Sequence, residues 1–172
     1  MNLSFKKCSL KNLKKLVEIS KTTFINAFEK ANNPKDFSNY INVAFSESKI
    51  RSELLNENSD FYFTYLNNKL VGYFKLNKNE AQTETFNTKT IELERIYVIE
   101  QFQHQGIGKY MLFEIFKIVK SNNVSFLWLG VWEKNRAAIK FYQRYDFKKF
   151  DTHFYYIGND KQTDWLMKLD FI

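Results

Sequence analysis

The chain of 172 residues has little of what marks secreted, disordered or membrane-spanning proteins. Its single cysteine, Cys8, excludes an internal disulfide. One proline and 5 glycines are too few for a flexible linker or a proline-rich segment. No run approaches the ~18 apolar residues of a membrane span, and the first residues do not resemble a secretory signal. These absences predict a cytoplasmic protein with one domain over residues 1–172 and no membrane partner.

Positive charge is in surplus, with 26 Lys+Arg against 19 Asp+Glu and a net charge of +7. Such a surplus can attract nucleic acid or another polyanion. The lysines are nevertheless scattered along the chain, without the blocks of about five like charges that mark interaction tails. We therefore interpret the charge as solvated faces and do not expect nucleic acid as a partner.

Hydrophobic periodicity divides the chain into helices and strands. Helical spacing in the first part changes to a period of two after residue 60. The expected strands are 3–8, 61–66, 70–76, 91–98, 126–132, 147–157 and 163–171, and residues 77–89 form a loop. The expected helical regions are 10–31 and a second one from residue 34, with a third piece at 47–55, and then 106–120 and 135–145. The order β-α-α-β-β-β-α-β-α-β-β predicts an α/β fold.

Asparagines mark two of the expected boundaries. Asn67 and Asn68 separate two strands, which predicts a hairpin because asparagine tolerates the positive φ of a tight turn. Asn33 directly precedes Pro34, an arrangement typical of a helix N-cap followed by proline at the first helical position.

The segment from Gln103 to Gly108, QHQGIG, lies between an expected strand and an expected helix. Its two glycines let the backbone approach a ligand, and the helix start presents unpaired N–H groups that suit a pyrophosphate. It is no Walker A loop, because Lys109 is followed by Tyr110 instead of Ser or Thr. It is no dinucleotide fingerprint either, because Met111 stands where the third glycine belongs. Alone, this loop is a weak signal.

The surrounding motifs make the loop specific. LERIYV at Leu93–Val98 precedes it, and Asn135-x-x-Ala138-x-x-Phe141-Tyr142 follows it. Together they resemble the GCN5-related N-acetyltransferase (GNAT) family, in which a Q/R-x-x-G-x-G/A loop binds the pyrophosphate of acetyl-CoA. Other stretches look like the PaiA-type spermidine/spermine N-acetyltransferases within it: Thr23-Phe24 with Phe28, Asn33–Asp36 with Tyr40 and Phe45, Trp128–Asn135, His153-x-Phe and Gly158–Asp164.

The resemblance implies a GNAT fold, with a mixed, mostly antiparallel central sheet and helices on both faces. It also implies acetyl-CoA as co-substrate, direct transfer to a small amine, and no metal. The implied acetyl-CoA-binding residues are Ile96, Tyr97, Val98, Gln103, His104, Gln105, Gly106, Ile107, Gly108, Lys109, Asn135 and Ala138. Two of these residues also have an interpretation without ligand contact, since Asn135 can be a helix N-cap and His104 a solvated spacer. Asp146 replaces the glycine that the family usually has at a helix exit.

Amine acetylation needs a base, because a primary amine with a pKa of ~10.4 is almost wholly protonated at neutral pH. Glu94 matches the position that polyamine acetyltransferases of this family use as base. Glu92 lies two residues away, on the same face of the strand, and the choice between the two stays open. Arg95 is expected to face the other way and to pair with an acidic neighbour. Tyr142 matches the family's general acid, which protonates the departing thiolate.

The acceptor is the least defined part of this hypothesis. The residues implied to bind it are Phe24, Phe28, Tyr40, Glu92 and His153, although phenylalanines at helical spacing are usually core. A chain of +7 repels a polycation, so a polyamine acceptor requires a local acidic pocket, for which Glu92, Glu94, Asp36 and Glu133 are candidates. The alternatives are another amine, such as a peptide N-terminus or an aminoglycoside, and a basic nucleic-acid-binding regulator with this fold. A homodimer is left open.

Overall fold

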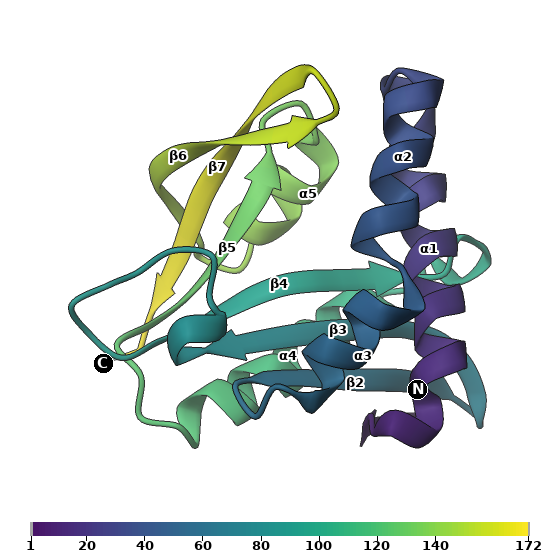
Figure 1. Ribbon diagram of the computed structural model, residues 1–172. Coiled ribbons are helices and arrows are strands. Elements are labelled where there is room, and N and C mark those ends of the chain that lie inside the picture. Colours follow the sequence, from purple (N-terminus) through teal and green to yellow (C-terminus); the bar gives the residue numbers. More distant parts are fainter. Residues whose placement is uncertain (1, 172) are drawn as a thin grey trace.

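A seven-stranded sheet forms the centre of the computed structural model, which describes residues 2–171 (Figure 1). Its strand order is β1-β2-β3-β4-β5-β7-β6. The strands are β1 (Leu3–Lys7), β2 (Ser59–Leu66), β3 (Lys69–Lys78), β4 (Thr90–Val98), β5 (Phe126–Trp132), β6 (Lys148–Ile157) and β7 (Asp160–Asp170). Neighbouring strands pair antiparallel, except β4 and β5, which run parallel.

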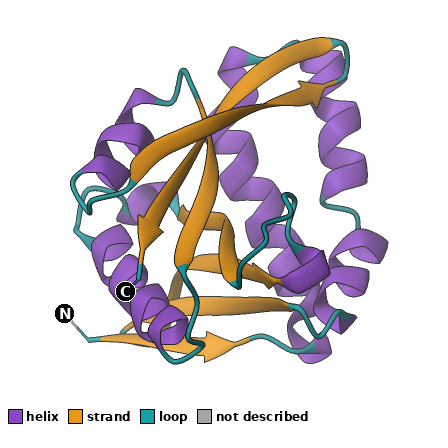
Figure 2. Cartoon of the chain, turned by 90° about the vertical axis from the view of Figure 1, so that its left-hand side faces the viewer, coloured by secondary structure: helices purple, strands orange, loops and turns teal. Residues whose placement is uncertain are grey.

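Five α-helices cover this sheet: α1 (Leu13–Phe28), α2 (Pro34–Ala44), α3 (Glu47–Leu55), α4 (Ile107–Lys120) and α5 (Arg136–Gln143). Helices α1–α3 pack on one face, and α4 and α5 pack on the other; Figure 2 shows the strands between these two groups. The predicted α/β fold, with a mostly antiparallel sheet and helices on both faces, is confirmed. Within residues 2–171, no helix combines the length and apolar character that crossing a bilayer requires.

Most expected elements agree with the structure to within a few residues, and the differences have local causes. The long first helix is α1 flanked by 3₁₀ turns at 10–12 and 29–31. A third separate helix, α3, begins because the Ser46 side chain accepts a hydrogen bond from the Lys49 N–H and caps it. The predicted loop at 77–89 starts later, since β3 continues to Lys78 and buries Asn77.

Asparagine and aspartate stand at several turns and helix ends, and five of the six non-glycine residues with positive φ among the described residues are of these types, His104 being the sixth. Asn67 and Asn68 have φ values of 47° and 65°, which makes the predicted hairpin turn between β2 and β3. The Asn33 side chain caps α2 by accepting hydrogen bonds from two backbone N–H groups. Asp146 has a φ of 66° after α5, so this non-glycine residue adopts the left-handed conformation expected of the helix exit.

The parallel strands β4 and β5 diverge, and this divergence positions the site. They pair only where Thr90–Glu92 lies beside Phe126–Trp128. Beyond that point, β5 continues with β7, and β4 continues with β3 toward α1 (Figure 1). Among the described residues, the β5-facing edge of Leu93–Val98 therefore has no strand partner, and its backbone groups on that side are free to bind a ligand.

Candidate active site

A cavity of ≈ 280 Å³ lies between the diverging ends of β4 and β5. Its walls come from α1, α2, β4, β5, α5, β6 and β7. Of the predicted site residues, it brings together Phe24, Phe28, Tyr40, Glu92, Glu94, Ile96, Tyr97, Asn135, Ala138, Tyr142 and His153. These residues span most of the chain, so the sheet gathers residues that the sequence places far apart.

The QHQGIG segment lies at the N-terminus of α4, outside the lining of this cavity. Gly106 takes the N-cap position with a φ of 79°, which glycine adopts without strain. The first N–H groups of α4 have no carbonyl one turn earlier, so they can bind an anion. Gln103 donates from its side chain to the Val98 carbonyl at 3.0 Å and ties this loop to the end of β4.

The side chains of the loop differ in what they can contact. His104, Gln105 and Lys109 are exposed, which is compatible with either contact to a phosphate or solvation. The side chain of Ile107 is buried in the core against the sheet, so only its backbone could face a ligand. At this point a bound acetyl-CoA would therefore have to contact main-chain groups of the loop.

Tyr142 and Asn135 belong to α5 and its N-cap. Tyr142 is buried against Phe141 and Phe147, and its hydroxyl makes no side-chain hydrogen bond within residues 2–171. Burial raises the pKa of this phenol, so it keeps its proton at neutral pH. The Asn135 side chain accepts a hydrogen bond from the Ala138 N–H at 3.2 Å, which confirms the capping role; its contact with acetyl-CoA stays a prediction.

A β-bulge at Glu94 makes the Arg95 side chain point in a direction other than the one expected from strand alternation. Lys75 of β3 pairs with Arg95, but the next residue, Leu76, pairs with Leu93, so Glu94 is the extra residue. The expectation that Arg95 faces away from Glu94 is wrong, because the bulge interrupts the alternation: the two side chains are in contact at 2.9 Å and both line the cavity. Its pairing with an acidic neighbour is confirmed, since Arg95 also forms two hydrogen bonds of 3.0 Å to Glu53.

The two candidate bases have opposite protonation tendencies. Glu92 is buried and accepts hydrogen bonds from the Thr83 N–H and hydroxyl and from Asn77, yet its burial raises its pKa. For Glu94, burial acts in the same direction, but Arg95 and Lys75 overcome it and lower the pKa to about 2. Glu94 is therefore the permanently ionised carboxylate of the pair, and Glu92 is the one that binds a proton more readily.

His153 forms a cation on the β6 side of the cavity. Its Nδ1 lies 2.8 Å from a Glu84 carboxylate oxygen, and its Nε2 lies 3.6 Å from Asp164. The nearby Asp164 carboxylate is the main cause that raises the His153 pKa to about 9, against an opposing effect of burial. The imidazole is thus protonated at neutral pH and is held between two carboxylates.

The acidic residues of the cavity differ in part from those expected. Glu92, Glu94 and Asp164 line it. Asp36 does not; it packs against the turn at Gly158, where an added Cβ would lie 2.4 Å from the Asp36 Cγ atom. Glu133 is also absent from the lining. The sequence signals for Asp164 and Arg95 are their places in the GNDKQTD and LERIYV stretches, whereas Thr83 carries no local signal.

Aromatic side chains form the α1–α2 wall of the cavity. The Phe24 ring lies 4.7 Å from Phe28, 5.0 Å from Phe45 and 5.6 Å from Tyr40, measured between ring centroids. Within residues 2–171, no cluster of three or more His, Cys, Asp or Glu side chains is arranged to hold a metal ion. The cavity thus combines one aromatic wall with charged side chains on its strands.

Comparison with known proteins agrees with this architecture. The chain matches the family described as "Acetyltransferase (GNAT) family" over residues 13–147. An uncharacterized N-acetyltransferase of Lactobacillus delbrueckii subsp. lactis, from the pepI 3′ region, is 36% identical over 160 residues, which cover 93% of this chain and 92% of the relative. The spermidine N(1)-acetyltransferase of Thermoplasma acidophilum is 25% identical over 158 residues, or 88% of this chain and 92% of that one.

A solved structure extends the agreement to the whole fold. The crystal structure of the PaiA N-acetyltransferase of Thermoplasma acidophilum, in complex with coenzyme A, has a TM-score of 0.78 to this chain. The two are 22% identical, and the match covers 99% of this chain and 100% of that one. With the family match over most of its length, the chain belongs to the GNAT family of acetyl-CoA-dependent N-acetyltransferases.

Proposed function

We propose that this enzyme acetylates a primary amine of a polyamine such as spermidine or spermine, by direct transfer from acetyl-CoA. The observation that carries the choice of acceptor is the charge of the cavity. The carboxylates of Glu92, Glu94 and Asp164 outnumber the cations of Arg95 and His153 in its lining, although the chain as a whole carries +7. A local acidic cavity attracts an amine that the overall charge repels.

The aromatic wall supports the same acceptor. Phe24, Phe28 and Tyr40 present ring faces and edges that can pack on a methylene chain and attract its ammonium groups. A relative of 25% identity carries the name spermidine N(1)-acetyltransferase, which is consistent with this chemistry.

The donor fits the free edge of β4 and the start of α4. Acetyl-CoA supplies an acetyl thioester that is activated toward amines. The N–H groups at Gly106–Gly108 would hold its pyrophosphate, and the unpaired edge at Ile96–Val98 would pair with its pantetheine arm as an added strand does. A backbone N–H near Val98 would stabilise negative charge that develops on the thioester oxygen.

Glu94 orients the amine and draws its proton away. With a pKa of about 2, this carboxylate stays ionised and accepts hydrogen bonds strongly, but it holds a proton poorly. Direct transfer from an amine with a pKa of ~10.4 is therefore uphill, and the proton leaves through water that Glu94 binds. Glu92 remains the alternative proton acceptor on the same strand.

Tyr142 supplies the proton that the departing thiolate needs. Its hydroxyl is protonated at neutral pH and lines the cavity. A phenol in this position can protonate the departing thiolate as the new amide forms, so no thiol nucleophile is required.

The test is steady-state thiol release from acetyl-CoA with matched acceptors. We expect kcat/KM to be higher for spermidine than for butylamine. The amines of spermidine that are not acetylated can interact with carboxylates of the cavity, and butylamine has no such additional amine. The Asp164→Asn variant should reduce that preference about tenfold, an energy of ~1.4 kcal/mol that is typical of one charged contact. Glu133→Gln, outside the cavity, is the control and should leave the preference unchanged.

Other outcomes assign another acceptor. Turnover of an N-terminal peptide or an aminoglycoside, without turnover of any polyamine, would contradict the polyamine proposal and keep the acetyl transfer. Salt-dependent DNA binding without turnover of any amine would favour the regulator instead.

A further inference from the structure

Lys75 is buried directly beneath the acceptor cavity. This lysine on β3 is 3% exposed, and it is absent from the cavity lining. Its ammonium forms an ion pair with Glu94 and lies 3.3 Å from Glu53 of α3. Lys75 therefore touches the carboxylate that faces the acceptor but cannot itself touch the acceptor.

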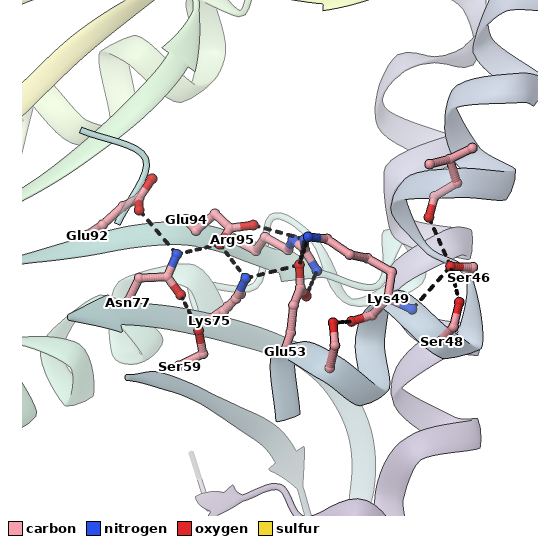
Figure 3. Close-up of polar contacts among 12 residues, drawn as sticks. Ser46, Ser48, Lys49, Glu53, Ser59, Lys75, Asn77, Glu92, Glu94 and Arg95 are labelled. Carbon is pink, nitrogen blue, oxygen red and sulfur yellow. Dashed lines mark hydrogen bonds and ion pairs between the residues drawn. The ribbon is translucent and has the colours of Figure 1, made fainter. Parts of the chain in front are cut away.

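The contacts of Glu94 fix the direction of its carboxylate. One oxygen accepts from Lys75 and from the Asn77 side chain, and the other pairs with Arg95 at 2.9 Å. The Ser59 hydroxyl donates to the Asn77 oxygen at 2.9 Å, which keeps the Asn77 nitrogen directed at Glu92 and Glu94. Figure 3 shows these donors around Glu94. The carboxylate is thus held from the sheet side while it remains part of the cavity lining.

Glu53 joins Lys75, Glu94 and Arg95 in a network of ion pairs that connects α3 to the sheet. It receives both Arg95 hydrogen bonds and the Lys75 ammonium, and it lies 3.8 Å from Lys49 (Figure 3). Glu53 and Lys75 are both below a tenth exposed. Buried ion pairs of this kind add little to folding compared with apolar side chains of similar volume, so packing alone does not require an ammonium at position 75.

We propose that Lys75 is a positioning residue for acetyl transfer, whose ammonium keeps Glu94 charged and directed into the acceptor cavity. This inference rests on the role that the proposed function gives to Glu94. It adds a requirement for a residue outside the cavity, on a strand that carries none of the predicted site residues.

The effect of removing Lys75 depends on the other charged and titratable groups around Glu94. Lys75 and Tyr73 face it from β3, Arg95 and Glu92 from β4, and Tyr40 from α2, while Glu53 acts from α3. Without Lys75, Arg95 is the remaining cation in contact with Glu94, and two other carboxylates stay close by. Proton binding to Glu94 then becomes easier, and its carboxylate loses a donor that fixes its direction.

The test compares Lys75→Met with Lys78→Met. Lys78 is on the same strand but pairs with Asp60 at 2.9 Å outside the cavity, so it is a matched control. Glutamate carboxyl carbons are followed by NMR from about pH 4 to 8, with Glu94→Gln to assign the signal. We expect no titration of Glu94 in the wild type or in Lys78→Met, because its pKa is about 2. In Lys75→Met the midpoint should rise by ~2 to 3 pH units, to about 4 to 5, at the lower end of that window.

Kinetics provides the second readout. In Lys75→Met, kcat/KM should fall at least about tenfold at neutral pH, since a misdirected carboxylate loses its effect, and the ratio to wild type should fall further below about pH 5. Using the ratio removes the titration of the amine itself. Lys75→Arg keeps the charge and should restore most of the activity.

A Lys75→Met protein that is folded, with Glu94 still silent above about pH 4 or with unchanged kcat/KM, would overturn the proposal. If Lys75→Met does not fold, Lys75→Gln replaces it with the same expected and contradicting results. The NMR titration needs no acceptor, so a failure of the polyamine assignment and a failure of the Lys75 inference are distinguishable.

Discussion

The two faces of the central sheet bury different chemistry. On the face covered by α4 and α5, the core is almost entirely apolar, with Leu112 and Ile115 packed against Leu127 and Leu129. On the face covered by α1–α3, apolar residues share the interior with buried Glu53, Lys75 and Glu92. Asp60 is buried as well, but it pairs with Lys7 and Lys78 away from the cavity. Among the described residues, the buried network of ion pairs that reaches the cavity belongs to the α1–α3 face.

This difference separates stability from catalysis. Apolar burial contributes about 25 cal/mol for each Å² removed from water, so the α4 face stabilises the fold directly. Burial of charge is unfavourable unless each ion is paired, so the α1–α3 face needs its network of ion pairs merely to break even. What the network does provide is control of protonation in the cavity, where Glu94 and Glu92 are driven in opposite directions.

The largest expected effect tests the charged face. Glu94→Gln keeps the shape of the side chain and removes its charge, so kcat/KM should fall ~10²- to 10⁴-fold, with the greatest loss at lower pH, where more of the amine is protonated. Steady-state rates over about pH 6 to 9 measure this. Glu114→Gln, on α4, is the control. Wild-type activity in Glu94→Gln together with a loss in Glu92→Gln would transfer the role to Glu92.

The next effect tests the apolar face. Leu112 of α4 is fully buried in the core against the sheet, so Leu112→Ala should lower the free energy of unfolding by about 2 to 5 kcal/mol. Because this residue lies outside the cavity, kcat/KM should be unchanged at temperatures where the variant is folded. Urea denaturation and steady-state kinetics measure the two quantities. A large loss of kcat/KM in the folded variant would mean that the two faces are not separable.

Tyr142 connects the two faces, since it packs with the α4-side core and also lines the cavity. Tyr142→Phe keeps the ring, so the melting temperature and the acetyl-CoA Kd should change little. The lost proton donor should reduce kcat by ~10²-fold or more. Tyr145→Phe, one turn later, is the control. Equal kcat in Tyr142→Phe and wild type would show that this tyrosine serves packing alone.

The smallest effect concerns the pH dependence of stability at His153. Its pKa is raised to about 9 from 6.5, so its ion pairs stabilise the fold fully below about pH 6.5, and this contribution is lost as the pH rises through about 9. His153→Gln should therefore lose about 1 to 2 kcal/mol of unfolding free energy near pH 6 and much less near pH 10. Equal losses at both pH values would show that His153 is not held as a cation.

Sequence patterns predicted most of the elements, because helices and strands follow from periodicities that neighbouring residues carry. Three local features were also predictable, because each depends on one or two residues and their own backbone: the turn at Asn67–Asn68, the cap at Asn33 and the helix exit at Asp146. Among site residues, the QHQGIG loop and the NxxAxxFY motif were found because they are contiguous. Their roles in binding and catalysis remain predictions.

By itself, the sequence determined the order of elements, the family, the acetyl donor and a set of candidate residues, because all of these are written in local patterns. Only the tertiary structure decided which of those residues meet. The bulge at Glu94 depends on pairing with β3, and the Arg95–Glu53 contact joins residues 42 positions apart. Charges interact through space and their energies change with burial. The pKa shifts of Glu94, Glu92 and His153 therefore arise only when β4, β6 and α3 have packed.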